Sequence, residues 1–457
     1  MVRSVTLVPS AQRLMESLRD LGYDLPTAIA DLVDNSIEAD ATEVRIDFHF
    51  AGTDSWIRIA DNGRGMSPPE LDEALRYGTR RSYDERHLGR FGLGLKTASL
   101  SQCQCLTVAT RAREEPERIE VRRWDLAHVG ETDSWDALKL DVSECRTECV
   151  EPLKETSGVV VFWERLDRIL NYRDPSGGWA KEGFARLCRN VEEHLAMVFH
   201  RFLSGEARRT LPLNIFINGN PVKPWDPFAR SEPATQSLGS QKLFLRGAGR
   251  TLSVTVRSYV LPSEAQFSSA RAREAASGPK KWNRQQGFYI YRADRMIQSG
   301  GWNRLRTLDE HTKLARIAID FSPMADAAFR INVAKMSVQL PDEIRNSLAA
   351  IASAVVARAK EAYRSHGTAP PGRSGGSRAG SSTGSRDVER TTPKSTTPSE
   401  YEAESQPADR RLARSVITVL KRELAEHPEL LSRVLSALAE LSADFLPNDA
   451  GRDDAWE

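Results

Sequence analysis

The sequence predicts an α+β protein with more than one domain, and three observations support this. The chain has 457 residues, of which 40% are hydrophobic, so it can bury a large core, and its length favours two or three domains. Residues 1–200 alternate helical and strand patterns without the strand–helix–strand rhythm of a doubly wound sheet. Residues 366–408 are rich in Gly, Ser, Thr and Pro and almost lack apolar residues, which predicts a disordered linker.

The first domain is expected to begin with a helix and to continue with antiparallel strands. "PTAIADLVDNSIEA" has helical spacing, and its proline suits a first turn. "EVRIDFHF" alternates apolar and polar residues, as a half-buried strand does, and "AGTDS" is typical of a hairpin turn into "SWIRIADNG". Further strands are expected at "CLTVAT", "RIEVRRW", "ALKLDV" and "GVVVFWE".

A second unit is expected over residues 205–365. It opens with "LPLNIFINGNPV", in which Asn-Gly marks a turn between apolar strands, and it closes with a helix over 341–364. Beyond the linker, residues 409–446 regain helical periodicity and predict a helical hairpin, followed by a tail over 447–457. A small amphipathic hairpin on a tether is typical of a docking or self-association element.

Composition restricts the functional classes. The formal net charge is +1, so any surface for nucleic acid must be regional. No run of about 18 apolar residues occurs and the N-terminus lacks the apolar core of a signal peptide, so we expect a cytoplasmic protein without a membrane contact. The cysteines have neither the even number of a disulfide framework nor a usual zinc spacing, which favours buried structural thiols; they lie at positions 103, 105, 145, 149 and 188.

The expected first helix carries an unusual set of polar residues. Positions three and four apart share a helix face, so Asp31, Asn35 and Glu38 form one polar stripe beside an apolar face. Asp34 is turned about 100° from its neighbour Asn35, because consecutive helical residues are separated by that angle. Polar residues on a helix usually form its solvated face, so this stripe alone leaves a ligand site and a solvated face both open.

Two glycine-rich segments follow within the first 100 residues. "ADNGRGM" places Asp61 at the end of a strand, followed by glycines that permit close approach of a ligand. "GRFGLGLKTAS" is a glycine-rich loop that enters a helix, an arrangement that suits a phosphate. Neither is a common nucleotide motif, because Leu95 precedes Lys96 where a P-loop needs glycine, and "GRGMSP" lacks the third glycine of a dinucleotide fingerprint.

Taken in this order and spacing, the three segments resemble the motifs of the GHKL ATPase superfamily. This superfamily contains MutL, type II DNA topoisomerases, the ninety-kilodalton heat-shock chaperones, histidine kinases and MORC proteins. The resemblance covers residues 15–360 and is nearest to MORC-type and related bacterial ATPases. It implies a Bergerat-type α/β sandwich, with helices on one face of a mixed, mainly antiparallel sheet, followed by a ribosomal-S5-like α+β transducer domain.

The resemblance also implies roles for individual residues. Asn35 matches the asparagine whose carboxamide oxygen ligates Mg²⁺, and Asp61 matches the acid that accepts the adenine amino proton. Asp31 stands at the position of the general base, and Lys335 in "INVAKMSV" matches a transducer lysine that reaches the γ-phosphate. Gly89, Gly92 and Gly94 match the hinge of a lid whose mobile part covers roughly 67–91. The remaining nucleotide contacts that the resemblance implies are Gly63, Gly65, Met66, Gly89, Phe91, Gly92, Leu93, Gly94, Leu95, Lys96 and Thr97.

Two departures from the family pattern are notable. Most hydrolytic members carry glutamate where this chain has Asp31, which is one methylene shorter. A base must come within hydrogen-bond reach of the attacking water, so Asp31 works through a displaced water, works slowly, or marks a protein that holds ATP better than it cleaves it. The family also often has Gly-Thr before a late strand, whereas "TSGVVVF" has Thr156 ahead of Gly158.

The functional expectation is a Mg²⁺-dependent ATPase switch in which ATP closes the lid and drives N-terminal homodimerisation. The alternative is a nucleotide-gated scaffold or chaperone-like protein with little turnover. A histidine kinase is disfavoured, because those enzymes place the ATP domain after a phospho-acceptor helix. The resemblance to MORC proteins suggests action on DNA, such as antiviral defence, with the C-terminal helices available to a partner protein.

A regional charge bias leaves DNA contact open. Residues 241–316 contain 15 Lys and Arg against five acids. The aromatic residues Trp282, Tyr289, Tyr291 and Trp302 are interleaved with these cations. The region is therefore either a nucleic-acid surface or a solvated rim over ordinary core aromatics.

Overall fold

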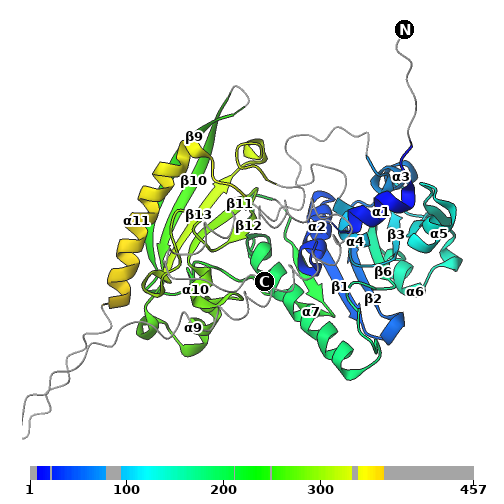
Figure 1. Ribbon diagram of the computed structural model, residues 1–457, viewed down its shortest axis with the longest axis horizontal. Helices are drawn as coiled ribbons and strands as arrows, with labels where there is room; N and C mark the ends of the chain where they lie inside the picture. The colour runs from blue at the N-terminus through cyan, green and yellow to red at the C-terminus, as the bar shows by residue number, and fades with distance from the viewer. Residues whose placement is uncertain are drawn as a thin grey trace, which may run out of the picture. The chain divides into compact units, whose positions relative to one another are not determined.

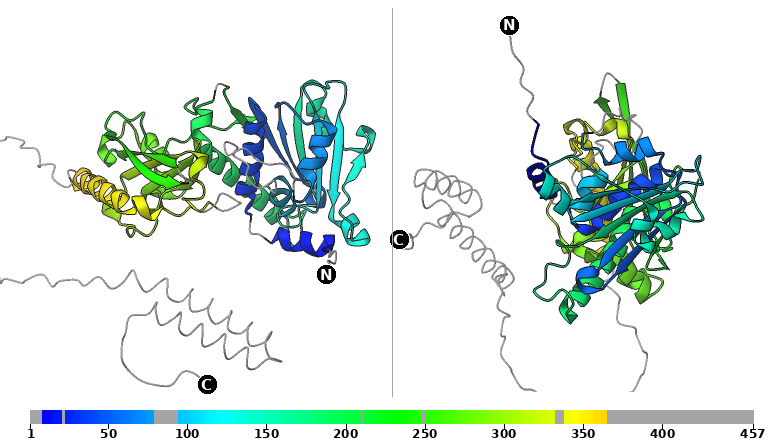
Figure 2. Two further views of the ribbon diagram at one scale, coloured as in Figure 1. Left: turned by 90° about the horizontal axis from the view of Figure 1, so that it is seen from above. Right: turned by 90° about the vertical axis from the view of Figure 1, so that its right-hand side faces the viewer.

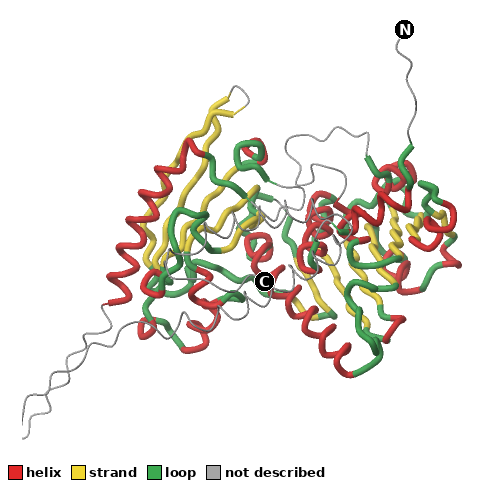
Figure 3. The backbone as a smooth tube through the Cα atoms, viewed as in Figure 1, coloured by secondary structure: helices red, strands yellow, loops and turns green. Residues whose placement is uncertain are grey.

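The computed structural model describes residues 8–20, 23–78, 94–209, 211–247, 250–331 and 338–364. These residues form two β-sheets with associated helices (Figure 1), and the alternation of strand and helix along the tube is visible in Figure 3. The predicted linker, C-terminal hairpin and tail, over 366–457, lie outside the described residues. Among the described helices, none is both long and apolar enough to cross a membrane.

Within the described residues, the first sheet has eight strands in the order β5–β4–β3–β6–β2–β1–β7–β8. Its pairs are antiparallel except for β1 with β7, which is parallel. The strands are β1 (Glu43–His49), β2 (Trp56–Asp61), β3 (Cys105–Arg111), β4 (Glu120–Asp125), β5 (Leu138–Leu140), β6 (Gly158–Glu164), β7 (Asn214–Ile217) and β8 (Asn220–Pro221).

Helices cover mainly one face of this sheet, because its strands alternate. In β2, Ile57 and Ile59 face the large core, while Trp56 and Ala60 face a small cluster on the other side. The larger helices contribute to the large core, and the small cluster is closed by α6 and the turn after it. The helices of this part are α1 (Ala11–Arg19), α2 (Leu25–Glu38), α3 (Pro68–Leu75), α4 (Gly94–Leu100), α5 (Leu126–Thr132), α6 (Thr147–Val150), α7 (Gly178–Val198) and α8 (His200–Leu203).

Helix α2 has local reasons to begin and end where it does. The side chain of Asp24 caps the N-terminus by accepting a hydrogen bond from the Thr27 amide at 2.9 Å, and Pro26 occupies the first turn. At the other end, the Ala39 amide bonds to the Asn35 carbonyl. The helix buries its apolar residues in the large core, as the spacing predicted.

The second sheet has five strands in the order β12–β11–β13–β10–β9 within the described residues. The β11–β13 pair is parallel and the others are antiparallel. These strands are β9 (Gln236–Gly247), β10 (Arg250–Val260), β11 (Gly287–Arg292), β12 (Arg295–Ser299) and β13 (Ala315–Phe321). The described helices of this part are α9 (Ala270–Ser277), α10 (Lys281–Gln285) and α11 (Asp342–Arg364).

Alternation gives the second sheet two different faces. Phe288 and Ile290 of β11 pack in one core with the long helix α11, which lies along the sheet in Figures 1 and 2. Tyr289 and Tyr291, on the opposite face of the same strand, belong to the large core of the first sheet. The two sheets therefore share apolar contacts as well as a covalent connection.

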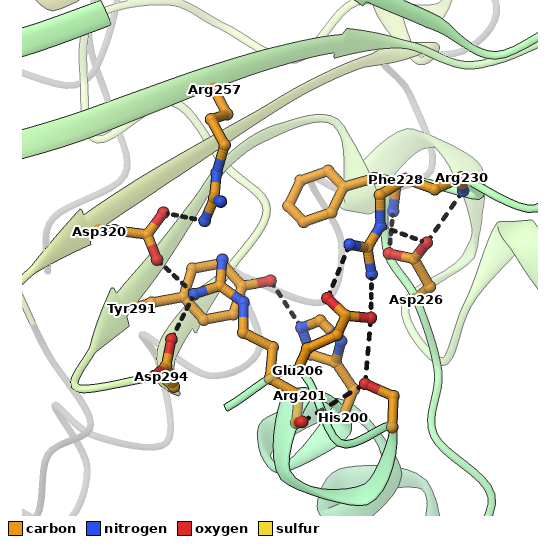
Figure 4. A network of polar contacts seen from close by, with 11 residues as sticks. His200, Arg201, Glu206, Asp226, Phe228, Arg230, Arg257, Tyr291, Asp294 and Asp320 are labelled. Carbon is orange, nitrogen blue, oxygen red and sulfur yellow. Dashed lines mark hydrogen bonds and ion pairs between the residues drawn. The ribbon is translucent and has the colours of Figure 1, made fainter. Parts of the chain in front are cut away.

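A buried polar network reinforces this contact (Figure 4). The guanidinium of Arg201, on α8, pairs with Asp294 at 3.2 Å and with Asp320, and it stacks 3.4 Å from the centroid of the Tyr291 ring. The Nε2 atom of His200 lies 2.8 Å from the Tyr291 hydroxyl. The short helix α8 is thus fixed to strands β11 and β13 by charge, stacking and a hydrogen bond.

The predicted fold class is confirmed as a mixed α/β sandwich followed by a second sheet domain. One assignment needs correction. The segment "LPLNIFINGNPV", which we placed in the second unit, forms β7 and β8 of the first sheet, because its main chain pairs with β1. The Asn-Gly turn is present as predicted, with positive φ at Asn218 and Gly219. The other domain boundaries stay predictions.

His200 makes stability depend on pH. Burial, assisted by the neighbouring Arg201 cation, lowers the pKa of His200 to about 4. The unfolded value is about 6.5, so the stabilisation from neutral His200 is complete above that pH and is lost as the pH falls toward 4. We expect His200→Gln to remove about 2 kcal/mol of the decrease in unfolding free energy between pH 6.5 and 4.5.

Thermal unfolding across this pH range measures the effect. His49→Gln is the control, because His49 is exposed on the same domain. If His200→Gln loses stability with falling pH as steeply as the wild type does, His200 is not responsible for the pH dependence.

Candidate functional site

Asp61, at the end of β2, ties two of the predicted motifs together. Its Oδ2 atom accepts a hydrogen bond from the Ser36 hydroxyl of α2 at 2.9 Å. Its Oδ1 atom accepts from the Gly63 amide at 2.9 Å and from the Val159 amide at 3.3 Å. Burial raises the pKa of Asp61 although these three donors act in the opposite direction. The carboxylate is therefore held in a fixed orientation between α2, β2 and β6.

The glycines after Asp61 are required by the fold itself. A Cβ atom at Gly63 would lie 2.8 Å from the Ala39 carbonyl oxygen and 2.9 Å from Asp61 Oδ1. Gly65 has a φ of +69°, and a Cβ atom there would lie 2.1 Å from the Arg111 carbonyl oxygen. The loop is thus packed against α2 and β3, and the expected approach of these glycines to a bound base stays a prediction.

Met66 completes this loop. Its amide donates to the Thr110 hydroxyl at 2.8 Å, and that hydroxyl donates to the Gly158 carbonyl at 3.0 Å. Its side chain is partly buried against the large core. Thr110 therefore joins the second motif to Gly158 at the start of β6, while Thr156, two residues earlier in the chain, is exposed.

The polar residues of α2 fall into two groups rather than one stripe. Asp31 and Asp34 are buried, with 4% and 1% of their surface exposed, whereas Asn35 is exposed. The Tyr23 hydroxyl donates to Asp31 Oδ2 at 3.0 Å. A Cβ atom at Gly94 would lie 3.9 Å from the same oxygen, so the third motif meets the first at Asp31.

An arginine that the sequence analysis did not identify reaches these carboxylates. The Nε atom of Arg295, on β12, lies 2.7 Å from Asp34 Oδ2, and its Nη2 atom lies 3.5 Å from Asp31 Oδ1. Only 2% of Arg295 is exposed. No sequence pattern could have found this contact, because 261 positions separate Arg295 from Asp34.

Lys96 is placed differently from the expected phosphate ligand. Its Nζ atom donates to the carbonyl oxygens of Ala74 at 2.9 Å and Arg76 at 2.6 Å, at the C-terminal end of α3. Burial lowers the pKa of Lys96 to about 8. The ammonium thus holds the end of α3, and its predicted phosphate contact would require it to leave these carbonyls.

The segment predicted to be a lid, roughly 67–91, is described only in part. Its first portion forms α3, and Leu71 and Leu75 of that helix are buried in the large core. Among the later predicted contacts, Leu95 packs against the same core and Thr97 is buried. The predicted contacts Gly89, Phe91, Gly92 and Leu93, together with Lys335, lie outside the described residues.

The basic region 241–316 divides into buried and exposed parts. Tyr289, Tyr291 and Trp302 are at most 2% exposed, so they are core aromatics and not a base-stacking surface. Three of its arginines are also buried, namely Arg292, Arg295 and Arg316. The exposed cations include Lys242, Arg246, Arg250, Arg304 and Arg306.

The described residues include no group of three or more His, Cys, Asp or Glu side chains that could hold a metal ion. All five cysteines are free thiols. Cys103, Cys105 and Cys149 are buried, and burial raises their pKa values. These three thiols are therefore packing residues with little thiolate character.

Comparison with known proteins identifies the class to which this fold and site belong. A family described as "Histidine kinase-, DNA gyrase B-, and HSP90-like ATPase" matches residues 23–158. The ATPase morc-1 of Caenorhabditis elegans is 33% identical over 85 residues, which cover 19% of this chain and 10% of that protein. The DNA mismatch repair protein MutL of Salmonella arizonae is 30% identical over 221 residues, which cover 47% of this chain and 31% of that protein.

A second MutL, from Azorhizobium caulinodans, is 35% identical over 99 residues, covering 21% of this chain and 16% of that protein. The chain thus spans about a third or less of the length of these relatives. Residues 23–158 thus belong to the GHKL ATPase superfamily, and the chain is similar to MORC and MutL proteins.

The residues present fit ATP and Mg²⁺. An ionised carboxylate has about four acceptor positions, and the three donors to Asp61 leave one for an amino group. Asn35, one residue before Ser36, presents an exposed carboxamide, and Mg²⁺ prefers such oxygen ligands. An acceptor for a base at the end of β2 and an oxygen for a metal on α2 thus lie close together, because Ser36 bonds to Asp61.

Asp61→Asn tests the acceptor. The amide would present N–H groups to Ser36, Gly63 or the adenine, all of which need an acceptor at this position. We expect ATP affinity to fall by at least about tenfold, as for the loss of a charged hydrogen bond. Isothermal titration calorimetry measures this affinity.

Asp47→Asn is the matched control, because Asp47 is a strand carboxylate of the same sheet that pairs with Arg58 instead. It should leave ATP affinity within about twofold, since it contacts no predicted site residue. An Asp61→Asn protein that is folded and binds ATP as the wild type does would exclude Asp61 from the site.

Proposed function

We propose that this chain is a Mg²⁺-dependent ATP-binding and ATP-hydrolysing switch. In this switch, ATP closes the lid and drives dimerisation of the N-terminal domains. The observation that carries the proposal is the convergence of three separate motifs: Asp31 adjoins Gly94, and Ser36 on the same helix bonds to Asp61. Membership of the GHKL superfamily supports ATP binding by this arrangement.

Each site residue then has a chemical role. Asp61 accepts the adenine amino proton, and Asn35 supplies an oxygen to Mg²⁺, which when bound neutralises phosphate charge. Asp31 orients and deprotonates the attacking water. The backbone of Gly94 and the preceding glycine loop receive the phosphates, and Lys335 contacts the terminal phosphate.

The surroundings of Asp31 support slow hydrolysis. The side chain is short, one oxygen accepts the Tyr23 hydroxyl and the other faces the Arg295 cation. These two contacts and the missing methylene restrict how far the Asp31 carboxylate can reach toward an attacking water. The same observation favours a second candidate function, a nucleotide-gated scaffold or chaperone-like protein that holds ATP with little turnover.

We also propose that the switch acts on DNA and takes part in antiviral defence. The relatives named for DNA mismatch repair support action on DNA. The exposed cations of the basic region, such as Lys242, Arg246 and Arg250, would contact phosphates without reading sequence. The C-terminal helices would dock a partner protein.

Asn35→Ala tests the metal site. Without the carboxamide oxygen, Mg²⁺ should no longer strengthen ATP binding, so the variant with Mg²⁺ should bind ATP as weakly as the wild type in EDTA. We expect a loss of at least about tenfold, measured by calorimetry. Undiminished ATP binding by Asn35→Ala in the presence of Mg²⁺ would contradict the assignment.

Asp31 variants separate the two candidate functions. If Asp31 is the base, Asp31→Asn should keep ATP affinity and lose about 100-fold or more in turnover, the usual contribution of a general base. Asp31→Glu should raise turnover by restoring reach toward the water. Phosphate release at saturating ATP measures both. Fast hydrolysis by the wild type would remove the scaffold, and equal turnover in Asp31→Asn would remove Asp31 as the base.

A further inference from the structure

The turn between β11 and β12 concentrates three charged residues in four positions, "RADR" over 292–295. Arg292 ends β11, Arg295 begins β12, and the two residues pair across the hairpin. Ala293 and Asp294 have φ values of +47° and +69°, as in the two-residue turns that match strand twist. Such a tight turn leaves the charged side chains little freedom of position.

This one turn contacts two helices of the first domain. Asp294 pairs with Arg201 of α8 at 3.2 Å and accepts the Arg208 amide at 3.0 Å, and its place beside Arg201 is visible in Figure 4. Arg295 reaches α2, where it meets Asp34 and Asp31. The β11–β12 turn is therefore fixed both to α8 and to α2.

The geometry around Asp31 is asymmetric. Arg295 is anchored through Nε at Asp34, 2.7 Å away, and this anchor leaves Nη2 3.5 Å from Asp31 Oδ1. The Tyr23 hydroxyl holds the other oxygen of Asp31. The side chains of Arg295, Asp34 and Asp31 are 3%, 1% and 5% exposed, so their interaction is weakly screened and changes strongly with position.

We propose that Arg295 is a positioning residue for Asp31, and that it makes ATP hydrolysis depend on the position of the β11–β12 turn. Asp34 anchors the guanidinium, and the guanidinium orients the Asp31 carboxylate. A shift of the second sheet changes the distance from Nη2 to Asp31 and so changes turnover. This inference rests on the proposed role of Asp31 as the base.

Kinetics of Arg295 variants give the first test. Arg295→Ala should lower kcat by about tenfold or more while ATP affinity stays within about threefold, because Arg295 acts on the base and not on the nucleotide. Arg295→Lys should recover part of kcat, since it keeps the charge without the planar fork. Asp34→Asn should lower kcat in the same direction, because it removes the anchor but leaves Asp31 intact.

A double-variant cycle separates this inference from the proposed function. If Arg295 acts through Asp31, the Asp31→Asn/Arg295→Ala double variant should be no slower than Asp31→Asn alone. If Asp31→Asn hydrolyses ATP like the wild type, the proposed role of Asp31 fails. If Asp31→Asn is slow and Arg295→Ala multiplies that loss, Asp31 remains the base and the positioning role of Arg295 fails.

Hydrogen exchange provides a readout that does not need turnover. In the wild type, ATP binding should slow amide exchange in both α2 and the β11–β12 hairpin, because Arg295 connects them. In Arg295→Ala, the change should persist in α2 and disappear from residues 287–299. Retained ATP-induced protection of the hairpin in Arg295→Ala would overturn the coupling.

Arg58→Ala is the matched control. Only 17% of the Arg58 side chain is exposed and it also pairs with a carboxylate, Asp47, but it lies on the face of β2 that Trp56 and Ala60 share, opposite the large core. Its loss should lower thermal stability without changing kcat or hairpin exchange. Equal kinetic effects of Arg58→Ala and Arg295→Ala, or a rise of kcat in Arg295→Ala, would overturn the proposal. If Arg295→Ala does not fold, Arg295→Lys and Asp34→Asn carry the test.

Discussion

The burial of two carboxylates on one helix is the constraint around which the nucleotide region is arranged. Asp31 and Asp34 lie among the buried apolar residues of α2, and a buried charge is costly unless a partner compensates it. Arg295 provides that compensation from the other sheet. The two buried carboxylates of α2 therefore have their compensating cation only when the second sheet is in place. The folded protein thus couples the helix that carries the proposed base to the position of the second sheet.

The features that short-range patterns encode were predictable from the sequence. Helix α2, the half-buried strand β1 and the Asn218–Gly219 turn follow from spacing, alternation and turn chemistry. The convergence of the three motifs followed from the family resemblance. Tyr23, Ser36 and Arg295 were missed, because a phenol, a hydroxyl or a distant cation beside a carboxylate leaves no periodic pattern in the sequence.

Two expectations show how packing overrides residue chemistry. A lysine after a glycine loop was expected to bind phosphate. A buried ammonium needs hydrogen-bond acceptors, however, and Lys96 finds them in the carbonyls at the C-terminal end of α3. Aromatic residues among cations resemble a nucleic-acid surface, yet Tyr289 and Tyr291 lie on the face of β11 that meets the first core. Burial distinguishes these cases, and burial is set by the tertiary fold.

The parallel pairing of β7 with β1 has a practical consequence for work on isolated fragments. A fragment cut at residue 200, where composition suggests a boundary, would lose β7 and β8. The edge of β1 would then present unpaired amides and carbonyls flanked by the apolar Val44 and Ile46, which is a template for intermolecular strand addition. A soluble nucleotide-binding fragment therefore has to extend beyond Pro221, so that the sheet carries its own protective edge.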